Sequence, residues 1–466
     1  MTQTAQPASD FRTPEVFRSP RRRQFLVLPE GWPLYAFVAL FPLWWLLGIS
    51  SPLTVFVAIP MAWTLRHRRL AVPPGFGLWL LFLVWVVASS AGLFSDAPGT
   101  LHRGAVSLLP AYIFRLASYV SATIVLLYVC NASGRFLTPA KLMLLQVVFF
   151  VELLIFGLLA LALPSASFTA PLAKILPASV ASSPFFQQGT KLTLAQVQDV
   201  LGHTSPRPAA PFPYSNTWGE VITLVLVWTI AWAALGGQRR RAFVAVALLV
   251  TLVPTVASLN RGMWVGMGVA VLYVAYRLAR QGRIMPLVGL AVALAIGVGA
   301  VLASPLATTI QERLDHGHSN RARSSISQAA VTGALAQPVL GYGSTRDIAG
   351  SAQTITVGRD AGCPQCGNAA IGGAGHLWLV LFAQGFPGVL LYVGFFLRTI
   401  WAYRRDPSPV AIAGSTVMLL GLVFSLVYGH VGMPLMLYML AAGLMWRARE
   451  GTDAASAGPP AVAVTA

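Results

Sequence analysis

His376 stands between a glycine-rich polar segment and a long apolar run in the stretch "GGAGHLWLVLFAQGFPG", Gly372 to Gly388. An imidazole takes up and releases protons near neutral pH, so His376 could act as a general base at the edge of a membrane. The alternative is an interfacial histidine hydrogen-bonded to a loop carbonyl, and position alone favours that alternative. His430, in a short polar segment between two later apolar runs, is a weaker candidate for the same role.

Arginines at the edges of apolar runs could bind an anion. Arg261 follows "SLN", and no acidic residue lies near it in the sequence. A guanidinium at membrane depth is costly and commonly marks a ligand path, and its donors match phosphate oxygens. The alternative is a snorkelling side chain that anchors a helix end. If Arg115, Arg321 and Arg323 converge with Arg261, they form a multi-arginine anion site; for Arg323 alone, a solvated loop charge is the favoured alternative.

Cysteines and intramembrane acids are weaker candidates for a functional site than the histidines and arginines. Cys363 and Cys366, in "CPQC", predict a structural disulfide that braces the segment before His376, because further zinc ligands and a thioredoxin-like setting are missing. Cys130 reads as a buried apolar residue. Glu152 lies inside an apolar run and is either functional or a neutral partner within a helix bundle. No phosphate-cradling loop or dinucleotide fingerprint occurs, so we expect neither a metal nor another cofactor.

The elements that must position these residues are membrane helices. The chain has 466 residues, of which 56% are hydrophobic and 10% charged, whereas soluble domains carry about 25% charged residues. Continuous apolar runs of about 20 residues recur along it and predict an all-α membrane protein. The net charge of +18 could indicate nucleic-acid binding, but the basic residues fall in short loops, as the positive-inside rule predicts.

Window hydropathy predicts about 12 spans. They lie near residues 32–49, 52–65, 74–94, 112–131, 141–163, 217–236, 242–258, 262–279, 284–303, 376–400, 408–428 and 431–447. If the spans alternate in direction, every basic cluster falls on one side of the membrane. That side is then cytoplasmic, both termini lie inside, and the protein belongs to the cytoplasmic (inner) membrane with its site on the outer face.

The chain divides into a basic cytoplasmic segment, 1–30, a polytopic membrane domain, 31–448, and a disordered cytoplasmic tail, 449–466. Two long segments, about 164–216 and 304–375, are expected at the outer face. In the first, Thr193 to Leu201 predicts a short amphipathic helix on the membrane surface. In the second, Ser319 to Pro338 predicts a capped helix, and "PVLGYG" after it a turn.

Four motifs in this order resemble the O-antigen ligase and O-antigen polymerase superfamily of polytopic membrane glycosyltransferases. The resemblance covers roughly Arg207 to the end of the tenth predicted span. The motifs are "RPAAPFPYSN" (Arg207 to Asn216), "SLNRG" (Ser258 to Gly262), "SNRAR…QPVLGYG" (Ser319 to Gly343) and "GHLWLVLFAQGFPG" (Gly375 to Gly388).

The resemblance implies a C-type glycosyltransferase that moves a glycan from an undecaprenyl-pyrophosphate carrier to an acceptor hydroxyl at the outer face of the membrane. Its mechanism would be inverting and metal-independent. Arg261 would contact the donor pyrophosphate, and His376 would activate the acceptor hydroxyl or bind near it. The substrate-binding candidates are Arg115, Arg207, Arg321 and Arg323. The implied partners are the lipid-linked glycan donor, a glycan or lipid-linked glycan acceptor and the lipid bilayer, without nucleic acid.

Other functions stay open at this point. A polymerase of lipid-linked repeat units shares the motifs and differs in its acceptor, and a protein O-glycosylating oligosaccharyltransferase is a third branch. The rival class is a polysaccharide or lipid transporter or flippase, which glycine-rich residues 284–303 favour slightly. The long outer segments and the lack of repeated spans count against a transporter.

Overall fold

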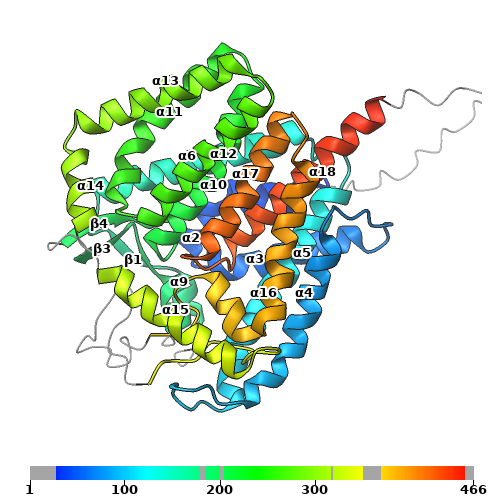
Figure 1. The fold of residues 1–466 in the computed structure, drawn as a ribbon, viewed down its shortest axis with the longest axis vertical. Coiled ribbons are helices and arrows are strands. Elements are labelled where there is room, and N and C mark those ends of the chain that lie inside the picture. The colour runs from blue at the N-terminus through cyan, green and yellow to red at the C-terminus, as the bar shows by residue number, and fades with distance from the viewer. Residues whose placement is uncertain (1–27, 178–183, 200–203, 316–317, 350–368, 457–466) are drawn as a thin grey trace, which may run out of the picture.

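The computed structural model describes residues 28–177, 184–199, 204–315, 318–349 and 369–456. Helices dominate this part of the chain (Figure 1). The long or apolar ones are α1 (Trp32–Ala39), α2 (Phe41–Leu47), α3 (Ser50–Leu65), α4 (Phe76–Ala88), α5 (Ala105–Asn131), α6 (Pro139–Ala162), α10 (Ser215–Ala234), α11 (Gln238–Ala257), α12 (Arg261–Arg280), α13 (Ile284–Leu302), α16 (His376–Tyr403), α17 (Pro409–Ser425) and α18 (Met433–Ser456).

The prediction of a helical multi-pass membrane protein is confirmed. Among the described residues, eight helices are long and apolar enough to cross a membrane, and α3 and α17 are shorter apolar helices. The first predicted span, 32–49, is two helices that meet at Leu40. Pro42 in the first turn of α2 lacks the N–H that would continue the hydrogen-bond ladder of α1, so the helix breaks there.

The centre of the bundle is formed by α5, α6, α10, α16, α17 and α18, which pack against one another. Its core includes fully buried rings such as Trp218, Tyr119 and Tyr392. Helix α13 has no buried residue and lies at the edge of the bundle beside α11 and α12 (Figure 1). Its apolar exposed side chains are those expected of a helix surrounded by acyl chains.

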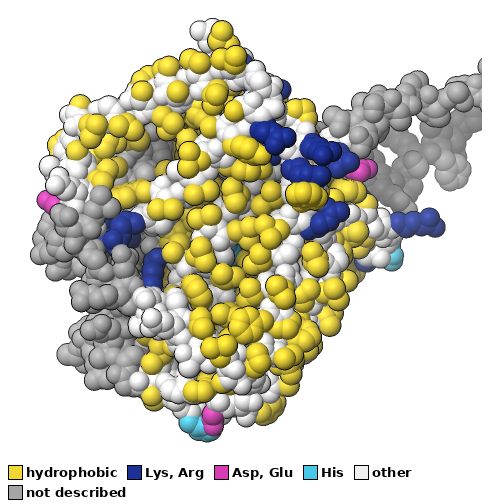
Figure 2. Space-filling view, in the orientation of Figure 1, with side chains coloured by type: hydrophobic (Ala, Val, Ile, Leu, Met, Phe, Trp, Pro, Cys, Tyr) yellow, Lys and Arg dark blue, Asp and Glu magenta, His cyan; other side chains and the backbone are white. Residues whose placement is uncertain are grey.

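Several helix ends that we expected on one side of the membrane do meet at one face. Arg68, after α3, contacts Glu30 at 2.8 Å and donates to the carbonyl of Asn131 at the end of α5. Arg447 of α18 donates to the carbonyl of Val129 at 2.8 Å. Figure 2 shows Lys and Arg side chains gathered near the end of α18, at the upper right. That this face is cytoplasmic stays a prediction.

The first of the two long segments, which we predicted at the outer face, contains short strands, so the prediction of an amphipathic helix over Thr193 to Leu201 is wrong. Strands β1 (Ser167–Thr169) and β2 (Lys191–Thr193) pair antiparallel, as do β3 (Ala195–Asp199) and β4 (Thr204–Pro208). Burial from 191 to 194 alternates with period two, and Val197, expected on the buried stripe, is 52% exposed. Two short helices, α7 (Leu172–Ile175) and α9 (Pro184–Thr190), complete this segment.

The second long segment contains α14 (Leu306–Asp315), which we did not predict from the sequence, and α15 (His318–Ala336), which confirms the predicted helix to within two residues. The turn after it, from Pro338 to Tyr342, is also present. Cys363 and Cys366, with their predicted disulfide, lie outside the described residues. Helix α18 continues to Ser456, so the expected boundary of the tail at 449 falls within a helix.

Candidate active site

The "SLNRG" motif forms the turn between α11 and α12, and it gathers arginines. Leu259 has a φ of 52°, a left-handed backbone that is rare for a leucine. This turn exposes two carbonyls toward neighbouring segments. The Nε of Arg207, in β4, donates to the carbonyl of Ser258 at 2.7 Å, and the Nε of Arg313, in α14, donates to the carbonyl of Leu259 at 3.0 Å. Both guanidinium groups are therefore held next to Arg261, the first residue of α12.

Four arginines from four elements form a cluster of positive charge: Arg207, Arg261, Arg313 and Arg323, the last from α15. Burial lowers the pKa of Arg313 to about 10, and the charges of Arg261, Arg207 and Arg323 add to this effect. Burial likewise lowers the pKa of Arg207 to about 10, assisted by Arg323. Buried like charges repel one another, so a bound anion would stabilise this arrangement. The Nε of Arg323 is buried without a hydrogen-bond partner.

The structure thus brings together three of the predicted arginines, Arg207, Arg261 and Arg323. Arg313 belongs with them, and sequence reasoning missed it. The helical spacing of Leu306, Ile310 and Leu314 was the available signal for α14, and it would have placed Arg313 on a helix. The backbone of Arg321 lies in α15, but its side chain falls outside the part that the structure describes.

His376 begins α16, where the tenth predicted span was expected to start, and its side chain is fully buried. Its backbone N–H donates to the carbonyl of Tyr428 at 2.7 Å. Its imidazole Nε2 lies 3.1 Å from the hydroxyl of Tyr119 in α5, while Nδ1 has no hydrogen-bond partner. In the alternative interpretation, the imidazole is hydrogen-bonded to a loop carbonyl. Instead, the backbone N–H of His376 binds a loop carbonyl, and one nitrogen of the imidazole has no hydrogen-bond partner.

Tyr428 connects the histidine to the arginine cluster. Its carbonyl accepts the N–H of His376, and its hydroxyl donates to the Oδ1 of Asn260, the N-cap residue of α12. Its hydroxyl also lies within electrostatic range of Arg207 and Arg323. Tyr428 therefore lies between His376 and the predicted anion site.

Arg115 has different neighbours from the cluster. It is buried in α5, and its Nη2 donates to the Oγ of Ser344 at 2.5 Å. Its charge acts on His376 and opposes that of Arg346. Arg346 itself donates to backbone carbonyls on both sides, including that of Gly92, and so fixes the loop that carries Ser344. Arg115 lies on the histidine side of the site.

Two of the motifs pack directly on each other. Within α16, Gly385 has φ 66° and ψ −169°, which kinks the helix. The N–H of Phe386 donates to the carbonyl of Pro338 at 2.9 Å, and the N–H of Gly343 donates to Ala383 at 2.8 Å. A Cβ at residue 385 would lie 2.4 Å from the oxygen of Pro338. The contact fastens α15, which carries Arg323, to the helix that begins with His376.

A buried acid that the sequence analysis missed lies beside His430. Glu220 of α10 is fully buried, and its Oε1 lies 3.1 Å from the Nε2 of His430. The two groups are close enough for an ion pair, but they do not form a hydrogen bond. The hydroxyl of Tyr438 donates to the same oxygen at 2.8 Å. The signal was an acid within an apolar run, the signal that drew attention to Glu152, which lies half-buried in α6.

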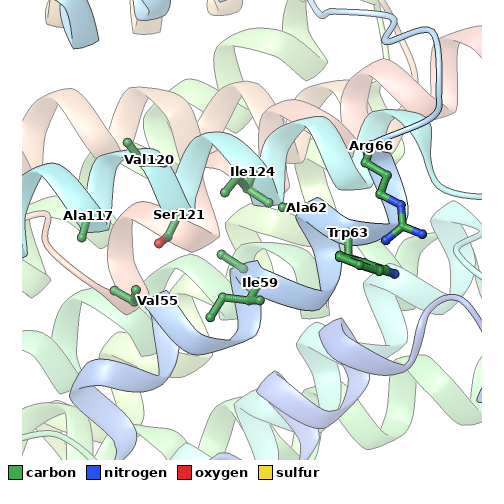
Figure 3. Close-up of a pocket in the computed structure, with 10 residues that line it drawn as sticks. Val55, Ile59, Ala62, Trp63, Arg66, Ala117, Val120, Ser121 and Ile124 are labelled. Carbon is green, nitrogen blue, oxygen red and sulfur yellow. The ribbon is translucent and has the colours of Figure 1, made fainter.

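An apolar groove of about 490 Å³ runs between α3 and α5 (Figure 3). At one end the guanidinium of Arg66 lies 3.3 Å over the ring of Trp63. None of the candidate site residues lines this groove, so it is not part of the site. Within the described ranges, no group of three or more His, Cys, Asp or Glu residues could hold a metal ion.

Comparisons with protein-family models, curated proteins and solved structures find no match to this chain.

Proposed function

We propose that the protein is a membrane glycosyltransferase that moves a glycan from a polyprenyl-pyrophosphate carrier to an acceptor hydroxyl at the outer face of the membrane. The observation that supports this best is the cluster of Arg207, Arg261, Arg313 and Arg323, joined through Tyr428 to His376. A pyrophosphate carries several negative charges and requires several donors. An arginine cluster at the end of apolar helices suits a pyrophosphate that is attached to a lipid.

In the proposed reaction, the acceptor oxygen attacks the anomeric carbon while the bond from that carbon to the pyrophosphate oxygen breaks. The arginines stabilise the negative charge that develops on the leaving pyrophosphate, a contact that low dielectric strengthens. His376 takes the proton of the acceptor hydroxyl, and its unpartnered Nδ1 is the position we assign to this role. One displacement inverts the anomeric centre. The arginines take the charge-stabilising role, so the proposed step is metal-independent.

His376 is buried, so the acceptor reaches it only after neighbouring side chains move. Tyr428 is the residue between His376 and the arginines, and we assign the meeting point of donor and acceptor to its vicinity. The acceptor decides the branch: attachment of a finished glycan is ligation, and extension of one lipid-linked repeat unit by another is polymerisation. We propose ligation, with polymerisation as the alternative on the same geometry.

The test is substitution of His376→Ala and Arg261→Ala in the native host. Lipid-linked and surface glycans are then profiled at matched protein levels. Accumulation of lipid-linked polymer with loss of attached glycan supports ligation, whereas accumulation of single repeat units supports polymerisation. Arg280→Ala, an exposed arginine at the other end of α12, and His102→Ala, an exposed histidine, are the matched controls. Unchanged profiles in both site variants contradict the proposed site and favour a transporter.

A further inference from the structure

His376 and His430 form a stacked pair of buried imidazoles. Their ring centroids lie 5.4 Å apart with an angle of 16° between the planes, and both side chains are fully buried. His430 is held from two sides, because its Nδ1 lies 2.8 Å from the hydroxyl of Tyr392 and its Nε2 lies 3.1 Å from Glu220. The two rings interact electrostatically, because a charge on one ring acts on the other across the stack.

Burial of a negative charge on Glu220 costs free energy. A fully buried carboxylate inside a membrane helix requires a partner. Tyr438 donates one hydrogen bond to Oε1, while Oε2 has no hydrogen-bond partner. The hydrogen bonding of the carboxylate is therefore incomplete. A positive charge on the neighbouring imidazoles would supply the missing stabilisation.

The other groups around the stacked pair do not supply a negative charge. From α5, Arg115 and Tyr119 face His376; from α16, Tyr392 does. Further titratable side chains are Tyr428, from the segment after α17, and Tyr438, from α18. Of the acids in the described part of the chain, Glu220 is the one whose charge acts on Tyr392, Tyr428 and Tyr438.

The geometry points to Glu220 as a positioning residue, acting through His430, whose carboxylate balances the positive charge that His376 gains from the acceptor hydroxyl. This inference rests on the proposed function. A proton on His376 without Glu220 would be a buried cation beside Arg115, with no counter-charge. The carboxylate also orients His430: with a proton on Nε2 toward Glu220, Nδ1 accepts the hydroxyl proton of Tyr392. The ring of His430 then stays parallel to that of His376.

The test compares Glu220→Gln with wild type in proteoliposomes, with a polyprenyl-pyrophosphate oligosaccharide as donor and the host's glycan acceptor, across a range of pH. The amide keeps the size and loses the charge, so protonation of His376 becomes harder. We expect the acidic limb of the kcat/KM profile to move to lower pH by about one unit, and the plateau rate to fall about tenfold or more. Glu220→Asp should restore the position of the limb in part.

Glu152→Gln, an acid of an apolar helix outside the site, is the matched control and should leave the profile unchanged. A Glu220→Gln profile that keeps its shape and falls only in proportion to the amount of folded protein, measured by thermal unfolding, overturns the inference and leaves the proposed function standing. Absence of glycosyl transfer by the wild-type protein in the same assay overturns the proposed function itself.

Discussion

The carbonyl of Tyr428 accepts the backbone N–H of His376 at 2.7 Å, while the hydroxyl of the same tyrosine donates to Asn260. The two halves of the candidate site are thus joined through one residue. Asn260 caps the helix that begins with Arg261, so a displacement of the tyrosine hydroxyl would shift the start of that helix. The relationship makes Tyr428 the first residue to examine apart from the histidine and arginines.

Tyr428→Phe removes the hydroxyl and keeps the ring. We expect the free energy of unfolding to fall by about 1 kcal/mol, because one buried hydrogen bond is lost. Transfer activity should fall about tenfold or more, because Arg261 loses part of its fixed position. Thermal unfolding and initial rates measure the two effects. Tyr276→Phe, an exposed tyrosine of α12, is the control; equal losses of activity in the two variants would contradict a role for the hydroxyl.

Inorganic pyrophosphate should stabilise the folded protein. Burial and the charge of Arg261 lower the pKa of Arg323, and bound pyrophosphate offsets both effects. The melting temperature should rise with pyrophosphate concentration at neutral pH and low salt. Arg323→Gln should reduce this rise, since it removes a charge from a side chain whose Nε has no hydrogen-bond partner.

Arg280→Gln, at the exposed end of α12, should respond to pyrophosphate like the wild type. Sulfate at matched ionic strength separates a specific site from general screening of charge. If both variants and the wild type gain the same stability from either anion, the arginine cluster is not a pyrophosphate site.

Gly385→Ala should weaken the contact between α15 and α16. A residue with a Cβ is strained at φ 66°, and the new atom would lie 2.4 Å from the carbonyl oxygen of Pro338. We expect a loss of about 1–3 kcal/mol in the free energy of unfolding. Gly394→Ala, in the same helix, places its Cβ 3.5 Å from Leu78, an ordinary contact. The Gly394→Ala variant should be at least as stable as the wild type. A loss of stability comparable to that of Gly385→Ala would show that the loss does not come from the backbone conformation of the kink.

The apolar helices could be predicted from the sequence because a span needs about 20 apolar residues, which is a local property. His376 and Arg261 stood out since a polar group at the edge of such a run is costly. The strand β3 could not be distinguished from a helix: its apolar spacing fits both periods, and pairing with β4 decided the outcome. In this segment, pairing with another strand had more influence on the structure than the local sequence pattern.

The contacts between residues of the site could not be predicted from the sequence for a different reason. Arg207 and Arg323 lie more than a hundred positions apart, and nothing in the local sequence records that Arg207 binds the "SLNRG" turn or that Arg323 lies within electrostatic range of Arg261. Tyr428 resembled any aromatic residue at a helix end. Glu220 carried the same signal as Glu152, but only the packing of α10 against α17 and α18 distinguishes the acid beside His430 from the other.

Glycosyl transfer is tested most directly by following a labelled glycan from a polyprenyl-pyrophosphate donor with the purified protein in proteoliposomes. We expect a new glycosidic bond with inverted configuration, and release of polyprenyl pyrophosphate in equal amount. His376→Ala and Arg261→Ala should each lower the rate by about 100-fold or more, while Arg280→Ala should not. Movement of the intact donor across the bilayer without bond formation would show that the protein is a transporter, and full activity in both site variants would show that the active site lies elsewhere.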